Sequence, residues 1–274
     1  MTVPGFIRVI LRSFIDFFRD GGLMLAGSMS YFFMMALIPF GLFLVTLFGY
    51  FIGEDIEFYH FFLSKLINFF PKITSGITEN LKSIIIFKGI GKFSLILYGL
   101  LSFQLFSSVE SSLNVIFKTK ERRSFIVSLI LSLLLVTIIM AFLLISFGAT
   151  TTISLLKTLK ESFPGLKIGA LTGFLIGFIV PVILVFFTAA TIYFLFPLKA
   201  VKVRHAACGA LFTAVLLEAA KHVFTIYVVK VAKLGTIYGP LSAFVIFLLW
   251  IFYSSCIFLV GAELVYNLGK TKEG

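Results

Sequence analysis

Six long apolar runs dominate this chain of 274 residues. A helix that crosses a bilayer needs about 20 mainly apolar residues, and each run is long enough. The runs are continuously apolar rather than alternating, which favours helices over barrel strands. The sequence therefore predicts an all-α polytopic membrane protein, a single membrane domain over 1–274, with six transmembrane helices at about 28–52, 93–117, 125–149, 169–196, 206–229 and 241–267.

Composition supports this class and narrows the partners. The chain is 60% hydrophobic and 13% charged, whereas soluble domains are about 45–50% apolar and about 25% charged. A net charge of +11 would suggest nucleic-acid binding in a soluble protein. Here the basic residues fall mostly between apolar runs, so we expect membrane lipids with anionic headgroups as partners, and no nucleic acid. Assembly into a homo-oligomer stays open.

The N-terminal segment 5–20 has a different pattern. Its three arginines and Asp16 recur at helical spacing and share one face, while aromatic and aliphatic residues cover much of the rest. This pattern predicts an amphipathic helix that lies in the membrane interface. The sequence "DGG" at 20–22 ends this helix before the first span.

The distribution of arginine predicts the topology. With six spans, all six arginines lie on the same side as both termini, and lysine is the only one of the two basic residue types, arginine and lysine, in the opposite loops. Because basic loops stay in the cytoplasm, both termini are predicted to be cytoplasmic. On the outer side, segment 53–92 contains an aromatic stretch that is too short to span and is broken by Pro71. We predict a helical outer cap there, between the first two spans.

Residues for catalysis are sparse. A metal-dependent nuclease needs clustered His, Asp and Glu side chains. The chain has three histidines, in the predicted cap, an inner loop and a span, and neither an HxHxDH-type cluster nor an HExxH motif occurs. No phosphate-binding or nucleophile motif occurs. We therefore expect no catalytic residue, no metal and no cofactor.

Three ionisable residues, Glu218, Lys221 and His222, interrupt the fifth apolar run. At 1.5 Å per residue Glu218 lies near the midplane, where a charge costs on the order of 3 kcal/mol. The spacing i, i+3, i+4 places all three side chains on one helix face. Two interpretations stay open: a buried ion pair that fixes helix packing, or part of a substrate or proton path.

Other polar residues are candidates for the same path. Glu110 lies in a serine-rich part of the second span and needs a partner or water. Glu263 lies near the cytoplasmic end of the sixth span, where an interfacial anchor is the alternative role. Tyr31 is a polar residue near the inner end of the first span.

A further set of residues suits packing or bending. Pro39 can kink the first span and free a carbonyl group. The fourth span carries a GxxxGxxxG stripe, which is typical of close helix packing. The stripe consists of Gly169, Gly173 and Gly177. Pro181 follows one turn after Gly177 and is a candidate hinge.

Four stretches resemble the YihY/BrkB family of bacterial inner-membrane proteins, often labelled ribonuclease BN-like. They are "AGSMSYFFMMALIPFGLFLV" (26–45), "SLNVIFKTKERRSF" (112–125), "GALFTAVLLEAAKHVFTIYV" (209–228) and "YGPLSAFVIFLLWIFYSSCIFLVGAELVYNL" (238–268). The resemblance covers nearly the whole chain. It implies six transmembrane helices with both ends in the cytoplasm, in agreement with the charge pattern. Members of the family have been linked to serum resistance, and one relative to export of a lipid precursor.

The leading hypothesis is a transporter or lipid-handling protein of the inner membrane. It would move an anionic lipid, or another envelope-related substrate, through a polar cavity lined by spans one, two, five and six. Lys221 is the candidate anion contact, and the candidate proton or cation groups are Glu218, Glu110 and His222. The alternative is a non-transporting scaffold for envelope proteins, with the polar patch as an internal staple. A ribonuclease is least favoured, because no metal-binding cluster occurs in the sequence.

Overall fold

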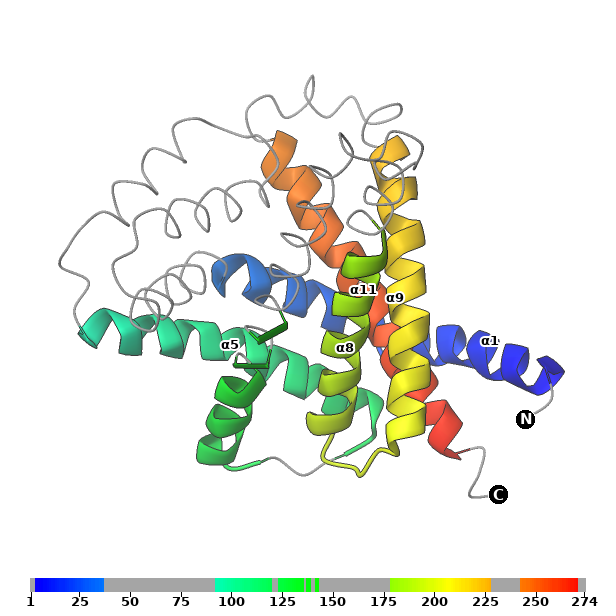
Figure 1. Ribbon diagram of the computed structural model, residues 1–274, viewed down its shortest axis with the longest axis horizontal. Coiled ribbons are helices and arrows are strands. Elements are labelled where there is room, and N and C mark those ends of the chain that lie inside the picture. Colours follow the sequence, from blue (N-terminus) through cyan, green and yellow to red (C-terminus); the bar gives the residue numbers. More distant parts are fainter. Residues whose placement is uncertain are drawn as a thin grey trace, which may run out of the picture. The chain divides into compact units, whose positions relative to one another are not determined.

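The computed structural model describes residues 3–36, 92–119, 123–135, 137–138, 141–142, 178–227 and 242–270. Helices are the only regular elements within these ranges, which confirms the predicted all-α class (Figure 1). The labelled helices are α1 (Val3–Arg19), α5 (Lys92–Ile116), α8 (Val180–Leu195), α9 (Val203–Ile226) and α11 (Ser242–Lys270). Two shorter apolar helices are Gly22–Ala36 and Phe125–Leu135.

The chain divides into two compact units by its internal contacts. Unit 1 comprises Met1–Leu23, Glu110–Val223 and Cys256–Gly274, and unit 2 comprises Met24–Val109 and Phe224–Ser255. Helices α5, α9 and α11 each contribute residues to both units.

Two described helical stretches are long and apolar enough to cross a membrane, namely Val203–Phe224 of α9 and Phe244–Lys270 of α11. The bounds of α5, α9 and α11 lie within three residues of the predicted spans in the same regions. The remaining predicted spans continue beyond the described residues. The chain therefore has apolar helices of membrane length, while the number of six spans stays a prediction.

Several predicted features lie outside the described residues. They include Pro39, nearly all of the predicted outer cap, and the glycine stripe. Pro181 is described and lies in the first turn of α8. A proline is tolerated there, because the first helical N–H groups have no partner within the helix. Its role as a hinge stays a prediction.

α1 has three faces rather than the two predicted. One face is buried at positions i, i+4 and i+8, namely Val9, Ser13 and Phe17. Val9 packs against two leucines of α11 in unit 1. A second face is apolar and exposed, and the third carries the exposed arginines. The exposed apolar residues are Ile7, Leu11, Phe14, Ile15 and Phe18. Part of the apolar surface of α1 thus packs on its own protein, and part is left for lipid.

In unit 1, α8, α9 and α11 meet where two glycines leave no room for a side chain. A Cβ at Gly209 of α9 would lie 2.9 Å from the carbonyl oxygen of Gly261 of α11. A Cβ at Gly261 would lie 2.5 Å from the Tyr193 hydroxyl and would overlap Thr213 Oγ1. Fully buried Tyr193 of α8 donates to the Phe258 carbonyl at 2.6 Å, and its hydroxyl lies 2.9 Å from Thr213 Oγ1. These bonds join the three helices at one point.

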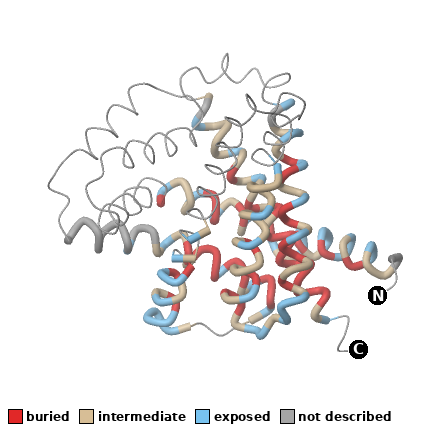
Figure 2. Tube along the Cα trace, viewed as in Figure 1, coloured by how far each residue is buried: buried red, intermediate tan, exposed pale blue. Residues whose placement is uncertain are grey.

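The C-terminal part of α11 is the core of unit 1. Residues 261–268 are all buried (Figure 2). The Tyr266 ring meets the Phe117 ring edge to face, with centroids 5.7 Å apart. A helix that faced lipid would leave one side exposed, so burial over two full turns means that protein surrounds this segment.

Candidate functional site

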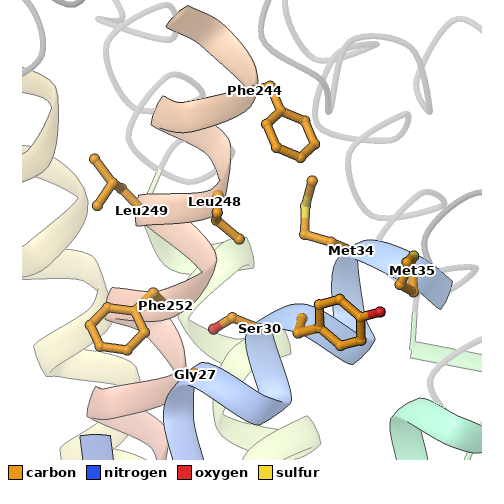
Figure 3. A pocket seen from close by; sticks show the side chains of 9 residues that line it. Gly27, Ser30, Met34, Met35, Phe244, Leu248, Leu249 and Phe252 are labelled. Atoms are coloured by element: carbon orange, nitrogen blue, oxygen red, sulfur yellow. The ribbon is translucent and has the colours of Figure 1, made fainter. Parts of the chain in front are cut away.

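An apolar pocket of about 470 Å³ lies in unit 2, between the helix Gly22–Ala36 and α11 (Figure 3). The first helix presents one side of the pocket and α11 the other. Two of the lining residues carry hydroxyl groups, and the others are glycine, methionine, phenylalanine or leucine. The lining residues are Gly27, Ser30, Tyr31, Met34, Met35, Phe244, Leu248, Leu249 and Phe252.

Ser30 holds the two walls of this pocket together. It is buried, donates to the Ala26 carbonyl at 2.6 Å, and lies 3.4 Å from the Ser255 hydroxyl of α11. Tyr31, a predicted path residue, is more than half exposed beside it. The sequence predicted a polar cavity, whereas this pocket is apolar. Its walls suit hydrocarbon, with two hydroxyls to contact a polar group.

The three ionisable residues of α9 lie together in unit 1. Lys221 Nζ is 2.5 Å from Glu218 Oε1, and His222 Nε2 is 3.6 Å from the same oxygen. The Glu218 side chain is 11% exposed, Lys221 40% and His222 69%. This is the geometry that i, i+3 and i+4 spacing produces on one helix. The Glu218 side chain is therefore shielded, while the side chains of Lys221 and His222 reach the surface.

The other two predicted path residues of unit 1 have different neighbours. Glu110 is buried on α5 beside buried Ser108 and Ser112. Glu263 is fully buried on α11, and its nearest charged neighbours are Asp16, Asp20 and Lys118. Complete burial does not suit an interfacial anchor that reaches lipid headgroups. Glu218 and Glu263 therefore have different charged neighbours among the described residues.

A polar cluster between α1 and α11 surrounds Glu263. Asn267 donates to Asp16 Oδ2 at 3.0 Å and to Ser13 Oγ at 3.2 Å. Arg12 Nε lies 3.5 Å from the same Asp16 oxygen. Sequence reasoning did not single out Asn267 or the role of Asp16. The available signal was that two of only three aspartates in the chain lie one turn apart, on the arginine face of α1.

Lys118 completes this cluster from an unusual backbone turn after α5. Its φ is +55°, and its side chain forms an ion pair with Asp20. The Lys118 N–H bonds the Val115 carbonyl at 3.1 Å, and the Thr119 N–H bonds the Asn114 carbonyl at 3.0 Å. This is a Schellman turn with lysine where glycine is usual. Strain of this kind, about 1–2 kcal/mol, tends to be kept where a side chain is needed.

Two substitutions of Lys118 distinguish the effect of backbone strain on stability from the effect of the ion pair. Both Lys118→Ala and Lys118→Gly remove the bond to Asp20, but only glycine adopts a positive φ freely. We expect Lys118→Gly to be more stable to unfolding than Lys118→Ala by about 1 kcal/mol. Thermal unfolding of the purified variants in detergent checks this order. Equal stabilities would mean that this position does not hold a left-handed backbone.

Among the described residues, no group of three His, Cys, Asp or Glu side chains is arranged to hold a metal ion. The described residues place charged side chains on α9 and leave an apolar pocket between two other helical segments.

Comparisons with known proteins agree with the resemblance found in the sequence. Residues 14–273 match the family model described as "Virulence factor BrkB". A UPF0761 membrane protein of Aliivibrio salmonicida is 29% identical over 256 residues, which is 90% of this chain and 79% of the relative. One of Haemophilus influenzae is 28% identical over 261 residues, 90% of each chain. No solved structure matches. Since the family model covers nearly the whole chain, the protein belongs to the BrkB family of membrane proteins.

Proposed function

We propose that this protein binds a membrane lipid and moves it across the bilayer, with an anionic lipid or another envelope-related molecule as substrate. The observation that carries the proposal is the apolar pocket of unit 2. Its volume of about 470 Å³ falls within the range of ligand-binding cavities, about 300–1,000 Å³. Methionine, phenylalanine and leucine walls suit an acyl chain, while Ser30 and Tyr31 offer hydroxyls to its polar end.

The charge distribution supports an anionic substrate. On α1 the exposed arginines lie next to an exposed apolar face, and such a helix binds anionic lipid surfaces. We propose that α1 lies at the cytoplasmic surface of the bacterial inner membrane, with both termini in the cytoplasm. No catalytic step is part of the proposal.

Filling the pocket tests the proposal. The experiment follows fluorescent phosphatidylglycerol and phosphatidylcholine in vesicles that contain the purified protein. The wild type should move the anionic lipid, and Met34→Trp should lose this activity because the larger side chain occupies the pocket. Met24→Trp is the matched control, since Met24 lies on the same helix, is 83% exposed and does not line the pocket. Equal rates for Met34→Trp and Met24→Trp would rule out the pocket as the lipid site.

A scaffold without transport is the alternative, and the Glu218 patch separates the two functions. The ion pair between Glu218 and Lys221 joins two residues of the same helix, so it does not itself hold two helices together. In a transporter whose path includes the patch, Glu218→Gln and Lys221→Met should reduce lipid movement while unfolding near the wild-type temperature. In a scaffold, the same variants should unfold well below wild type, and no sample should move lipid.

A further inference from the structure

Glu263 is a buried acid that lacks a donor. Its exposure is 0%, and neither carboxyl oxygen has a hydrogen-bond partner among the residues that the structure describes. A buried polar group left without a hydrogen bond is destabilising, and a charged one is more so. The lipid-binding proposal does not use this residue, so its placement requires a separate explanation.

The nearest polar group to Glu263 is another acid. Asp20, the residue directly after α1, lies within hydrogen-bonding reach of it. The contact follows from the helix register. Asn267 donates a hydrogen bond to Asp16, Asp20 lies one turn after Asp16, and Glu263 lies one turn before Asn267. Asp20 and Glu263 are therefore brought together in the same way as Asp16 and Asn267. The Asp20 side chain is only 12% exposed, so water does little to separate the two carboxyl groups.

Four described cations near α1 and the C-terminal part of α11 already have partners. Lys118 is bonded to Asp20, and Arg12 lies against Asp16. The two other lysines near this part of α11, Lys199 and Lys270, lie over the ring of Tyr266 at 5.8 and 4.7 Å from its centroid. Lys118 is the cation that acts on Glu263, and it faces both acids of the pair.

Hydrogen-bond chemistry then favours a proton between the two acids. An ionised carboxyl group only accepts, so two carboxylates cannot bond each other. A protonated carboxyl group donates one hydrogen bond. Two close carboxylates of like charge also favour protonation of one of them. A single proton would therefore give one Glu263 oxygen a hydrogen bond, relieve the repulsion, and leave Asp20 able to accept from Lys118 as well.

We propose that Glu263 and Asp20 form a proton-binding site between α11 and α1, in which Glu263 carries the proton at neutral pH and donates to the Asp20 carboxylate. The proton is the ligand, and Lys118 fixes the charge of the acceptor. Asn267 and Asp16 hold the two helices in register one turn away. This inference does not depend on lipid movement, and it stands if the lipid-binding proposal fails.

Infrared spectroscopy of the purified full-length protein tests the site directly. A protonated carboxyl group gives a carbonyl band, sensitive to deuterium exchange, that is separate from the bands of carboxylates and amides. We expect this band in the wild type at neutral pH. In Glu263→Gln we expect its intensity to fall by the contribution of one carboxyl group. Glu110→Gln and Glu218→Gln are matched controls that should keep the contribution of Glu263 to this band. A folded Glu263→Gln with an unchanged band would overturn the proposal.

Asp20→Asn tests the sharing of the proton while Glu263 remains in place. The asparagine amide supplies a donor to Glu263, and Lys118 is no longer bonded to a competing anion, so Glu263 should ionise. The contribution of Glu263 to the carbonyl band should therefore disappear, although Glu263 itself is retained. If burial alone kept Glu263 protonated, the band would persist in Asp20→Asn, and a persistent band would refute the shared site. If Glu263→Gln does not fold, Asp20→Asn alone tests the proposal.

Discussion

Gly261→Ala is expected to lower the free energy of unfolding by about 3 kcal/mol, the upper part of the usual range for overpacked sites. The added Cβ would overlap Thr213 Oγ1 and lie 2.5 Å from the Tyr193 hydroxyl. Those two oxygens cannot both move away, because they lie 2.9 Å apart and Tyr193 is bonded to the Phe258 carbonyl. The strain would have to separate α11 from α8 and α9. Unfolding in detergent, followed by temperature and by denaturant, measures the loss.

Gly269→Ala is the matched control on the same helix. The nearest atom to a Cβ at Gly269 is His205 Nδ1 at 4.0 Å, which is ordinary contact. Alanine is a better helix former than glycine by about 1 kcal/mol, so this control should unfold at or above the wild-type temperature. Adding Thr213→Ala to Gly261→Ala should recover part of the loss, because the overlapped oxygen is gone. Equal melting of the Gly261 and Gly269 variants would disprove the close contact.

Tyr193→Phe is expected to lower the free energy of unfolding by about 1–2 kcal/mol. The change keeps the ring, which stacks on Phe258 at a centroid distance of 4.9 Å. It removes the hydrogen bond to the Phe258 carbonyl and the polar partner of Thr213 Oγ1. The lost groups are buried, so water does not replace them. Denaturant unfolding of the variant against wild type gives the value.

Tyr253→Phe controls for the loss of a tyrosine hydroxyl as such. Tyr253 lies on α11 and is half exposed, so its hydroxyl is accessible from outside the protein. We expect a change within about 0.5 kcal/mol for this variant. The double variant of Tyr193→Phe with Thr213→Val should cost less than the sum of its single changes, since both act on one bond. Additive costs would show that the Tyr193–Thr213 contact contributes nothing.

Helix positions were predictable because local physics sets them. An apolar run has to match the thickness of a bilayer, so its length gives the helix, and α5, α9 and α11 begin and end within three residues of the predicted bounds. The joint placement of Glu218, Lys221 and His222 is equally local. Residues three and four positions apart meet on any α-helix, whatever surrounds it.

Packing between helices was not predictable in the same way. The sequence drew attention to a periodic glycine stripe on the fourth span, but the described close contact uses Gly209 and Gly261, on two different helices. Single glycines carry no spacing signal that pairs them. The sequence predicted a polar cavity lined by spans one, two, five and six, but it did not predict an apolar pocket between Gly22–Ala36 and α11, which are joined through Ser30 and Ser255.

The sequence by itself determined the class of the protein, its apolar helices, its family and the polar patch of α9, because these depend on composition, periodicity and neighbours within one or two turns. Only the tertiary structure decided what surrounds Glu263. Its partner acid is more than 200 residues away in the chain, and Lys118 reaches it from a strained turn. Contacts between distant segments depend on how helices pack, and two acids in separate segments of the chain give no sign that they will meet.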